Sequence, residues 1–175
     1  DDTATASAAK VGTMRYRTGT EYVEVTGTEL ITNGDFDTDT DWTKGTGWSI
    51  SNGAATYDGT GGTADIKQTN ISGVVLGNIY KITIDVVSNQ GSGNNTIYLG
   101  GTVVNNTHLD AGSYTFYGSW TTNATLNIYG RSGEVFKIDN VSVIEVTAED
   151  ASYADMCMQT GSSTYEWVNI VRNTY

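Results

Sequence analysis

Apolar and polar residues alternate along many short segments of this chain, and a period of two predicts β-strands. In the segment 80–86, Tyr80, Ile82, Ile84 and Val86 fall on one face. Segments with the same alternation follow at 96–99, 124–129, 135–138 and 141–144. Glycine-rich turns separate them, and no sequence repeat extends through this part, so a solenoid or a propeller is not expected. Many short strands at this spacing predict a β-sandwich.

The two ends of the chain share a different pattern. Residues 14–17, a turn at 18–20 and residues 21–25 predict one hairpin, and residues 156–159 and 164–171 predict another. A lone hairpin is marginally stable in water, so we expect the two ends to pair in one small sheet. The expected organisation is a lead-in at 1–10, a discontinuous β module made of 11–28 with 148–175, and a β-sandwich at 29–147 inserted between its halves.

Composition narrows the classes of protein that this chain fits. Its 175 residues include 21 Gly and no Pro, and its hydrophobic content of 38% is enough for a sandwich core. The formal net charge of −11 repels phosphate backbones and anionic membranes, so neither is an expected partner. No stretch approaches the ~20 apolar residues needed to span a bilayer, so membrane insertion is not expected either. The acidity suits cations and neutral polar ligands instead.

One Cys and one His exclude an internal disulfide and a Cys/His zinc site. Cys157 is expected as a buried, inert thiol, and His108 as a surface residue. The chain starts without Met and shows no signal-peptide pattern, which is typical of a fragment or a processed product.

Two distant segments frame the predicted sandwich. Residues 30–37 read Leu-Ile-Thr-Asn-Gly-Asp-Phe-Asp, and residues 136–143 read Phe-Lys-Ile-Asp-Asn-Val-Ser-Val. Together with Trp42, Trp48 and the segments 66–68 and 77–82, they resemble the jelly-roll carbohydrate-binding modules of the galactose-binding-like superfamily. This resemblance covers about two thirds of the chain. It implies an all-β jelly-roll sandwich with a carbohydrate ligand.

The outer segments 11–17, 153–161 and 165–168 resemble a short β module of structural and fibre proteins of tailed bacteriophages. Because such modules are commonly trimeric, this resemblance implies a homotrimer among other virion proteins, on the virion surface and thus extracellular. The two resemblances together imply a non-catalytic carbohydrate-binding domain of a phage tail fibre or structural protein that mediates host attachment through glycans. The alternative is a purely structural decoration or cement protein of the virion that binds no sugar.

Aromatic and amide side chains on the strands are candidates for sugar binding. Sugars present flat apolar faces with polar rims, which Trp and Tyr cover while Asn, Gln and Arg bond the hydroxyls. The candidate residues are Tyr98, Tyr129, Asn127, Arg131, Trp120, Tyr117 and Gln68. The alternative is that the outward tyrosines only cover a sheet. Trp42 and Trp48 are expected in the core.

Four aspartates alternate between residues 35 and 41. The Gly and the terminal Glu of an EF-hand loop are missing, so an EF-hand is rejected. In the resembling modules a structural Ca²⁺ is often held between the opening acidic loop and an Asp of the closing strand, which implicates Asp35 or Asp37 with Asp139. A solvated acidic loop is the alternative.

No enzymatic activity is expected. Glycoside hydrolysis needs two carboxylates flanking the sugar, and the acidic residues here gather in turns rather than on the strands of the expected groove. His108 lacks a neighbouring Ser or acid that would indicate a triad.

Overall fold

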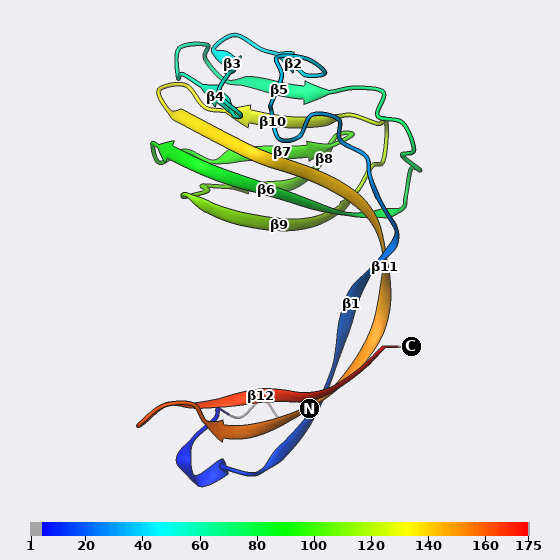
Figure 1. The fold of residues 1–175 in the computed structure, drawn as a ribbon, viewed down its shortest axis with the longest axis vertical. Coiled ribbons are helices and arrows are strands. Elements are labelled where there is room, and N and C mark those ends of the chain that lie inside the picture. Colours follow the sequence, from blue (N-terminus) through cyan, green and yellow to red (C-terminus); the bar gives the residue numbers. More distant parts are fainter. Residues whose placement is uncertain (1–4, 175) are drawn as a thin grey trace. The chain divides into compact units, whose positions relative to one another are not determined.

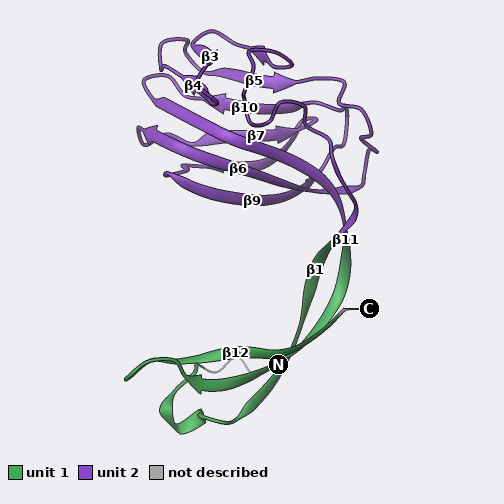
Figure 2. Cartoon of the chain, in the orientation of Figure 1, with its two compact units in different colours: residues 1–23, 147–175 green, residues 24–146 purple. Residues whose placement is uncertain are grey.

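The computed structural model describes residues 5–174, so residues 1–4 of the expected lead-in lie outside the described part. The chain divides into two compact units (Figure 2). Unit 1 joins Asp1–Val23 to Thr147–Tyr175, and unit 2 is Glu24–Val146. The boundary expected after residue 28 therefore falls after Val23, and the one expected after residue 147 falls after Val146.

Unit 2 contains two antiparallel sheets (Figure 1), which confirms the all-β sandwich. The first sheet has the order β3 (Trp48–Ile50), β4 (Ala55–Tyr57), β11 (Val135–Gln159), β6 (Ile79–Gln90) and β9 (Gly112–Ser119). The second has the order β2 (Thr43–Lys44), β5 (Ala64–Gln68), β10 (Leu126–Gly130), β7 (Asn95–Leu99) and β8 (Thr102–Thr107).

Alternate residues of these strands form the core between the two sheets, as the period of two predicts. Ile82 and Ile84 of β6 are buried, and so is Ile128 of β10. Trp42 and Trp48 are confirmed as core residues, with exposed fractions of 7% and 6%. Each indole still finds a backbone acceptor, at 2.9 Å in both cases, so neither N–H is buried without a partner.

The segments 135–138 and 141–144 were expected as two strands, but both belong to the single strand β11. The register shifts between them, where Asp139 pairs with Asp85 and Ser142 pairs with Thr83. Asn140 lies in this irregularity with φ of 50°, in the left-handed region that Asn tolerates better than most residues. The strand therefore continues through a bulge instead of ending in a turn.

In unit 1, β1 (Met14–Glu29) and β12 (Tyr165–Thr174) both pair with β11. The predicted C-terminal hairpin is confirmed, because Gln159 pairs with Tyr165. The predicted N-terminal hairpin is wrong: β1 passes through residues 18–20 without a turn. Pairing with β11 supplies partners for that backbone, and Gly19 packs against the ring of Tyr153 rather than adopting a left-handed turn conformation. Among residues 5–174, no helix is long and apolar enough to cross a membrane.

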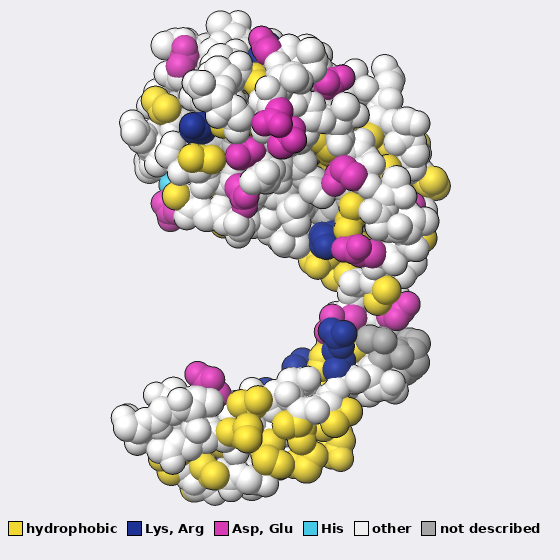
Figure 3. Space-filling view, in the orientation of Figure 1, with side chains coloured by type: hydrophobic (Ala, Val, Ile, Leu, Met, Phe, Trp, Pro, Cys, Tyr) yellow, Lys and Arg dark blue, Asp and Glu magenta, His cyan; other side chains and the backbone are white. Residues whose placement is uncertain are grey.

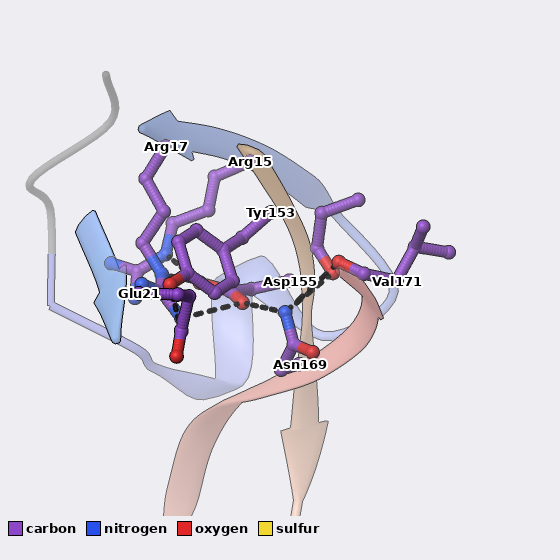
Figure 4. Close-up of polar contacts among 8 residues, drawn as sticks. Arg15, Arg17, Glu21, Tyr153, Asp155, Asn169 and Val171 are labelled. Carbon is purple, nitrogen blue, oxygen red and sulfur yellow. Dashed lines mark hydrogen bonds and ion pairs between the residues drawn. The ribbon is translucent and has the colours of Figure 1, made fainter. Parts of the chain in front are cut away.

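A buried carboxylate organises the polar side of unit 1 (Figure 4). Asp155 is 1% exposed and accepts hydrogen bonds from Arg17 Nε at 2.8 Å, Arg15 Nε at 3.0 Å and Asn169 Nδ2 at 3.0 Å. The hydrogen bond from Arg17 is the largest cause that lowers the pKa of Asp155 from 3.8 to about 2, and those from Asn169 and Arg15 add to it. Asp155 lies at a register shift that begins after Ala154.

Aromatic rings extend this polar cluster. The guanidinium of Arg17 lies 3.8 Å from the centre of the Tyr153 ring, and that of Arg15 lies 4.7 Å from the centre of the Trp167 ring. The Tyr153 hydroxyl donates a hydrogen bond to Glu21, which raises the pKa of Tyr153. Cys157 is fully buried in the same unit, as expected from the sequence.

Candidate functional site

Two tyrosines meet on the outer face of the second sheet of unit 2. Tyr98 of β7 pairs in register with Asn127 of β10, and Thr96 pairs with Tyr129. Tyr98 and Tyr129 are therefore diagonal neighbours on one face, because side chains two residues apart along a strand point the same way. Their ring centres lie 5.6 Å apart with the ring planes at 72°, an edge-to-face pair, and both side chains are half-buried.

A depression of about 180 Å³ lies beside this pair and is lined by Thr63, Thr96, Tyr98, Tyr129 and Arg131. The Arg131 guanidinium is held by two hydrogen bonds, from Nε to the carbonyl of Asn94 at 2.7 Å and from Nη2 to Thr96 Oγ1 at 2.9 Å. A guanidinium has five N–H donors, so these contacts orient Arg131 and leave donors for a ligand.

A second polar group borders the tyrosines along β10 and β5. Asn127 Nδ2 donates to Asp65 Oδ2 at 2.7 Å, and Lys67 Nζ lies 3.4 Å from the same oxygen. Burial is the largest cause that raises the pKa of Tyr129, and the charge of Asp65 adds to it. The Tyr129 phenol therefore stays protonated at neutral pH and can donate a hydrogen bond.

Two of the predicted site residues face the core instead. Trp120 is fully buried, donates from Nε1 to the Thr125 carbonyl at 2.9 Å, and packs edge-to-face on Tyr80 with ring centres 4.6 Å apart. Gln68 is 7% exposed and pairs in register with buried Leu126. The expectation that these side chains reach the ligand face is wrong.

Gln68 instead fastens the opening segment to the sheet. Its Oε1 accepts a hydrogen bond from the backbone N–H of Thr32 at 3.3 Å, and its Nε2 donates to the carbonyl of the same residue. The Gln68 side-chain amide thus bonds both backbone groups of Thr32, as a paired strand would. Such an amide is costly to remove, because both backbone groups would lose their bonds.

Tyr117 lies on β9 of the first sheet, where it pairs with Lys81 and is 41% exposed. It is therefore on a different sheet from Tyr98 and Tyr129. The structure adds three residues that were not predicted, Thr63, Thr96 and Asp65. Alternation places Asp65 on the opposite face of β5 from buried Ile66, and Thr96 on the opposite face of β7 from buried Ile97. It does not show that β5 and β7 lie on either side of β10, so these residues could not be assigned to one site from the sequence.

The predicted calcium residues lie in the opening loop and at the bulge of β11. Asp35 Oδ1 accepts a 3.4 Å hydrogen bond from the N–H of Asp37, and Asp139 Oδ1 accepts one of 2.7 Å from the N–H of Asn140. Within residues 5–174, no group of three or more His, Cys, Asp or Glu side chains is placed to hold a metal ion. A calcium site formed by Asp35 or Asp37 with Asp139 stays a prediction.

Protein groups already join the two ends of unit 2 at this place. Glu29 Oε1 accepts hydrogen bonds from the N–H groups of Ile31 at 2.8 Å and Val143 at 2.9 Å. The N–H of Val141 donates to the Gly34 carbonyl at 2.8 Å. A hollow of about 340 Å³ lies at this junction, with Glu29 and Asp35 in its lining.

Comparison with protein-family models and with curated proteins finds no match. Among solved structures, the chain is similar to one titled "Structure of CBM35 from Paenibacillus barcinonensis". The sequence identity is 16%, the TM-score is 0.37, and the match covers 74% of this chain and 97% of that one. Similarity at this level does not bear on what this chain binds.

Proposed function

We propose that unit 2 is a non-catalytic carbohydrate-binding domain and that its ligand lies on the outer face of the second sheet. The observation that carries this proposal is the Tyr98–Tyr129 pair beside the oriented guanidinium of Arg131. Half-buried aromatic rings offer an apolar surface to the C–H face of a sugar. Arg131 and Asn127 offer hydrogen bonds to its hydroxyls.

We further propose that the chain belongs to a bacteriophage structural or fibre protein and attaches the virion to glycans as a homotrimer. The depression beside the tyrosines is small, so a single site would bind weakly. Three linked sites on one particle would raise the overall affinity through multivalency. The competing proposal is a structural virion protein, which the packing of Tyr98 against Tyr129 also fits.

Replacing Tyr129 or Tyr98 with alanine should weaken glycan binding about fivefold, because each ring contributes on the order of 1 kcal/mol of aromatic contact. A glycan array would identify the ligand, and isothermal titration calorimetry would measure the dissociation constants. Tyr117→Ala is the matched control: it removes an exposed tyrosine from the other sheet and should leave the affinity unchanged.

The same array separates the two proposals. A blank array with protein shown to be folded would support the structural role and reject sugar binding. Repeating a positive array with a chelator tests calcium at Asp35, Asp37 and Asp139, because loss of binding is expected only if the ion holds the site in place.

Unit 1 carries the surface that we propose joins the copies. Large apolar side chains are exposed on it, including Tyr16 at 71%, Val171 at 57% and Met14 at 48%, and Figure 3 shows apolar side chains gathered over this unit. Sedimentation equilibrium should therefore give the mass of three chains, and Tyr16→Glu should shift the mass towards one chain. A mass of one chain for the unchanged protein would contradict the trimer.

A further inference from the structure

Two connections that cross between the sheets of unit 2 contact each other. Residues 91–94 join β6 of the first sheet to β7 of the second, and residues 131–134 join β10 of the second sheet to β11 of the first. We call them the loop 91–94 and the turn 131–134. The N–H of Glu134 donates to the Arg131 carbonyl at 3.1 Å, so these two residues begin and end one tight turn.

The side chains at both ends of the turn bond successive residues of the loop. Arg131 Nε donates to the Asn94 carbonyl at 2.7 Å, and Glu134 Oε1 accepts a hydrogen bond from the N–H of Gly93. Among residues 5–174, no turn or loop hydrogen bond between backbone groups involves the loop 91–94. The loop therefore depends on side chains from elsewhere in the chain for its conformation.

Glu134 also packs against the backbone of the loop. The residue is 5% exposed, and a side chain added at Gly91 or Gly93 would overlap the Glu134 side chain. Neither glycine has a φ in the left-handed region, so the close approach of Glu134 is what requires glycine at these positions. These contacts place the carboxyl group of Glu134 directly on the loop.

A second anchor of the loop is His108. Its Nδ1 lies 2.9 Å from the Gly93 carbonyl. His108, expected on the surface, is 26% exposed, and its Nε2 lies 3.3 Å from Asp110 Oδ1. The imidazole contacts the carbonyl of Gly93 and not its N–H, so it does not replace the bond that Glu134 accepts.

The loop carries one of the two groups that orient Arg131 in the candidate site. Arg131 lines the depression beside the tyrosines, and its other partner is Thr96 Oγ1, 2.9 Å from Nη2. Thr96 belongs to β7, so the sheet sets its position, whereas the position of Asn94 depends on the loop. A guanidinium that is already held in one orientation loses less side-chain freedom when a ligand binds.

We propose that Glu134 is the positioning residue of Arg131 in the ligand site. By accepting the Gly93 N–H, Glu134 fixes the loop 91–94 so that the Asn94 carbonyl orients the guanidinium. Glu134 and Arg131 form no ion pair in the described part of the chain, so Glu134 acts through the loop and not by direct charge pairing. The consequence for a ligand rests on the proposed sugar site, but the orientation of Arg131 does not.

The first test needs no ligand and measures the solvent exchange of the Arg131 Nε proton in the full chain by ¹H–¹⁵N NMR. Its signal is assigned as the one lost in Arg131→Lys. Glu134→Ala removes the acceptor for the Gly93 N–H and should speed this exchange at least about tenfold. Glu134→Gln keeps an acceptor oxygen and should stay within about twofold of the unchanged protein. Trp120→Phe, which alters the core beside Tyr80, is the control and should leave the signal unchanged.

The second test measures affinity by calorimetry for a glycan that the array identifies. Glu134→Ala should weaken binding about two- to tenfold, the range expected for one long side chain that must be ordered on binding. In an Arg131→Ala background the same change should have no further effect, because the group that Glu134 positions is absent. A loss of affinity that persists in that background would overturn the role through Arg131.

A third measurement uses no variant. The Gly93 amide of the unchanged protein should exchange at least about 100-fold more slowly than in an unfolded chain, because its N–H is bonded to Glu134. An unprotected Gly93 amide, an unchanged Arg131 signal in folded Glu134→Ala, or a Glu134→Gln protein that loses the signal would each overturn the proposal.

The two tests also separate this proposal from the proposed function. A blank array together with the expected Arg131 exchange would reject sugar binding and still support the positioning of Arg131 by Glu134. A glycan whose binding is weakened by Arg131→Ala but not by Glu134→Ala would support the sugar site and overturn the role of Glu134.

Discussion

Replacing Trp120 with alanine should lower the free energy of unfolding of unit 2 by about 3–5 kcal/mol. Trp120 is fully buried, and its loss leaves a cavity next to Tyr80 that the surrounding strands cannot fill completely. The Thr125 carbonyl would also lose the indole N–H that lies 2.9 Å away. Urea unfolding followed by circular dichroism measures the change.

Two further variants test the cause of this effect. Trp120→Phe fills part of the space and should lose less stability than the alanine variant. Tyr117→Ala removes a ring that is 41% exposed from β9, the strand that ends directly before Trp120, and should lose much less stability than Trp120→Ala. Trp120→Phe should bind a glycan as the unchanged protein does. A selective loss of binding in a folded Trp120→Phe protein would place Trp120 in the ligand site after all.

Replacing Asp155 with asparagine should destabilise unit 1 by about 2 kcal/mol at neutral pH. The folded-state pKa of Asp155, about 2, lies below its ordinary value of 3.8, so the ionised form is favoured by folding. This stabilisation is fully present above pH 4 and is lost as the pH falls from about 4 to about 2. The stability difference between the two proteins should therefore shrink over that range.

Trp167 makes this change visible, because it is the one tryptophan in the sequence of unit 1. With fluorinated tryptophan, the ¹⁹F resonance of Trp167 reports the unfolding of unit 1 separately from unit 2. Glu166→Gln is the control, since it neutralises an exposed carboxylate of the same unit, on β12 next to Trp167. It should change stability by no more than about 0.5 kcal/mol. If the stability difference between Asp155→Asn and the unchanged protein were as large at pH 2 as at pH 7, charge pairing of Asp155 with Arg15 and Arg17 would not be its cause.

Part of the candidate site was predictable from single strands. The segment 96–99 places Tyr98 opposite to its buried neighbours, Ile97 and Leu99, and the structure agrees. The same rule separates Tyr117 from Trp120, because residues three apart on one extended segment face opposite sides. Placing both on the ligand face was therefore inconsistent with the pattern itself.

Gln68 is buried although it was expected near the ligand face. It follows buried Ile66 by two residues and so faces the core, where its amide bonds the backbone of Thr32. Residue type alone favoured the surface, since Gln is mostly exposed. The partner that makes its burial tolerable is 36 residues away in the chain and cannot be read from local sequence.

The sequence by itself determined that the chain is all-β, that Trp42 and Trp48 belong to a core and that the C-terminal end forms a hairpin. These properties follow from alternation and turn residues, which act within a few positions of each other. Only the tertiary structure decided that β7 lies beside β10, which brings Tyr98 to Tyr129, and that Asn89 pairs with buried Phe136. Strand order depends on backbone pairing and core packing between residues far apart in the chain, and a period of two is the same whichever strand becomes the neighbour.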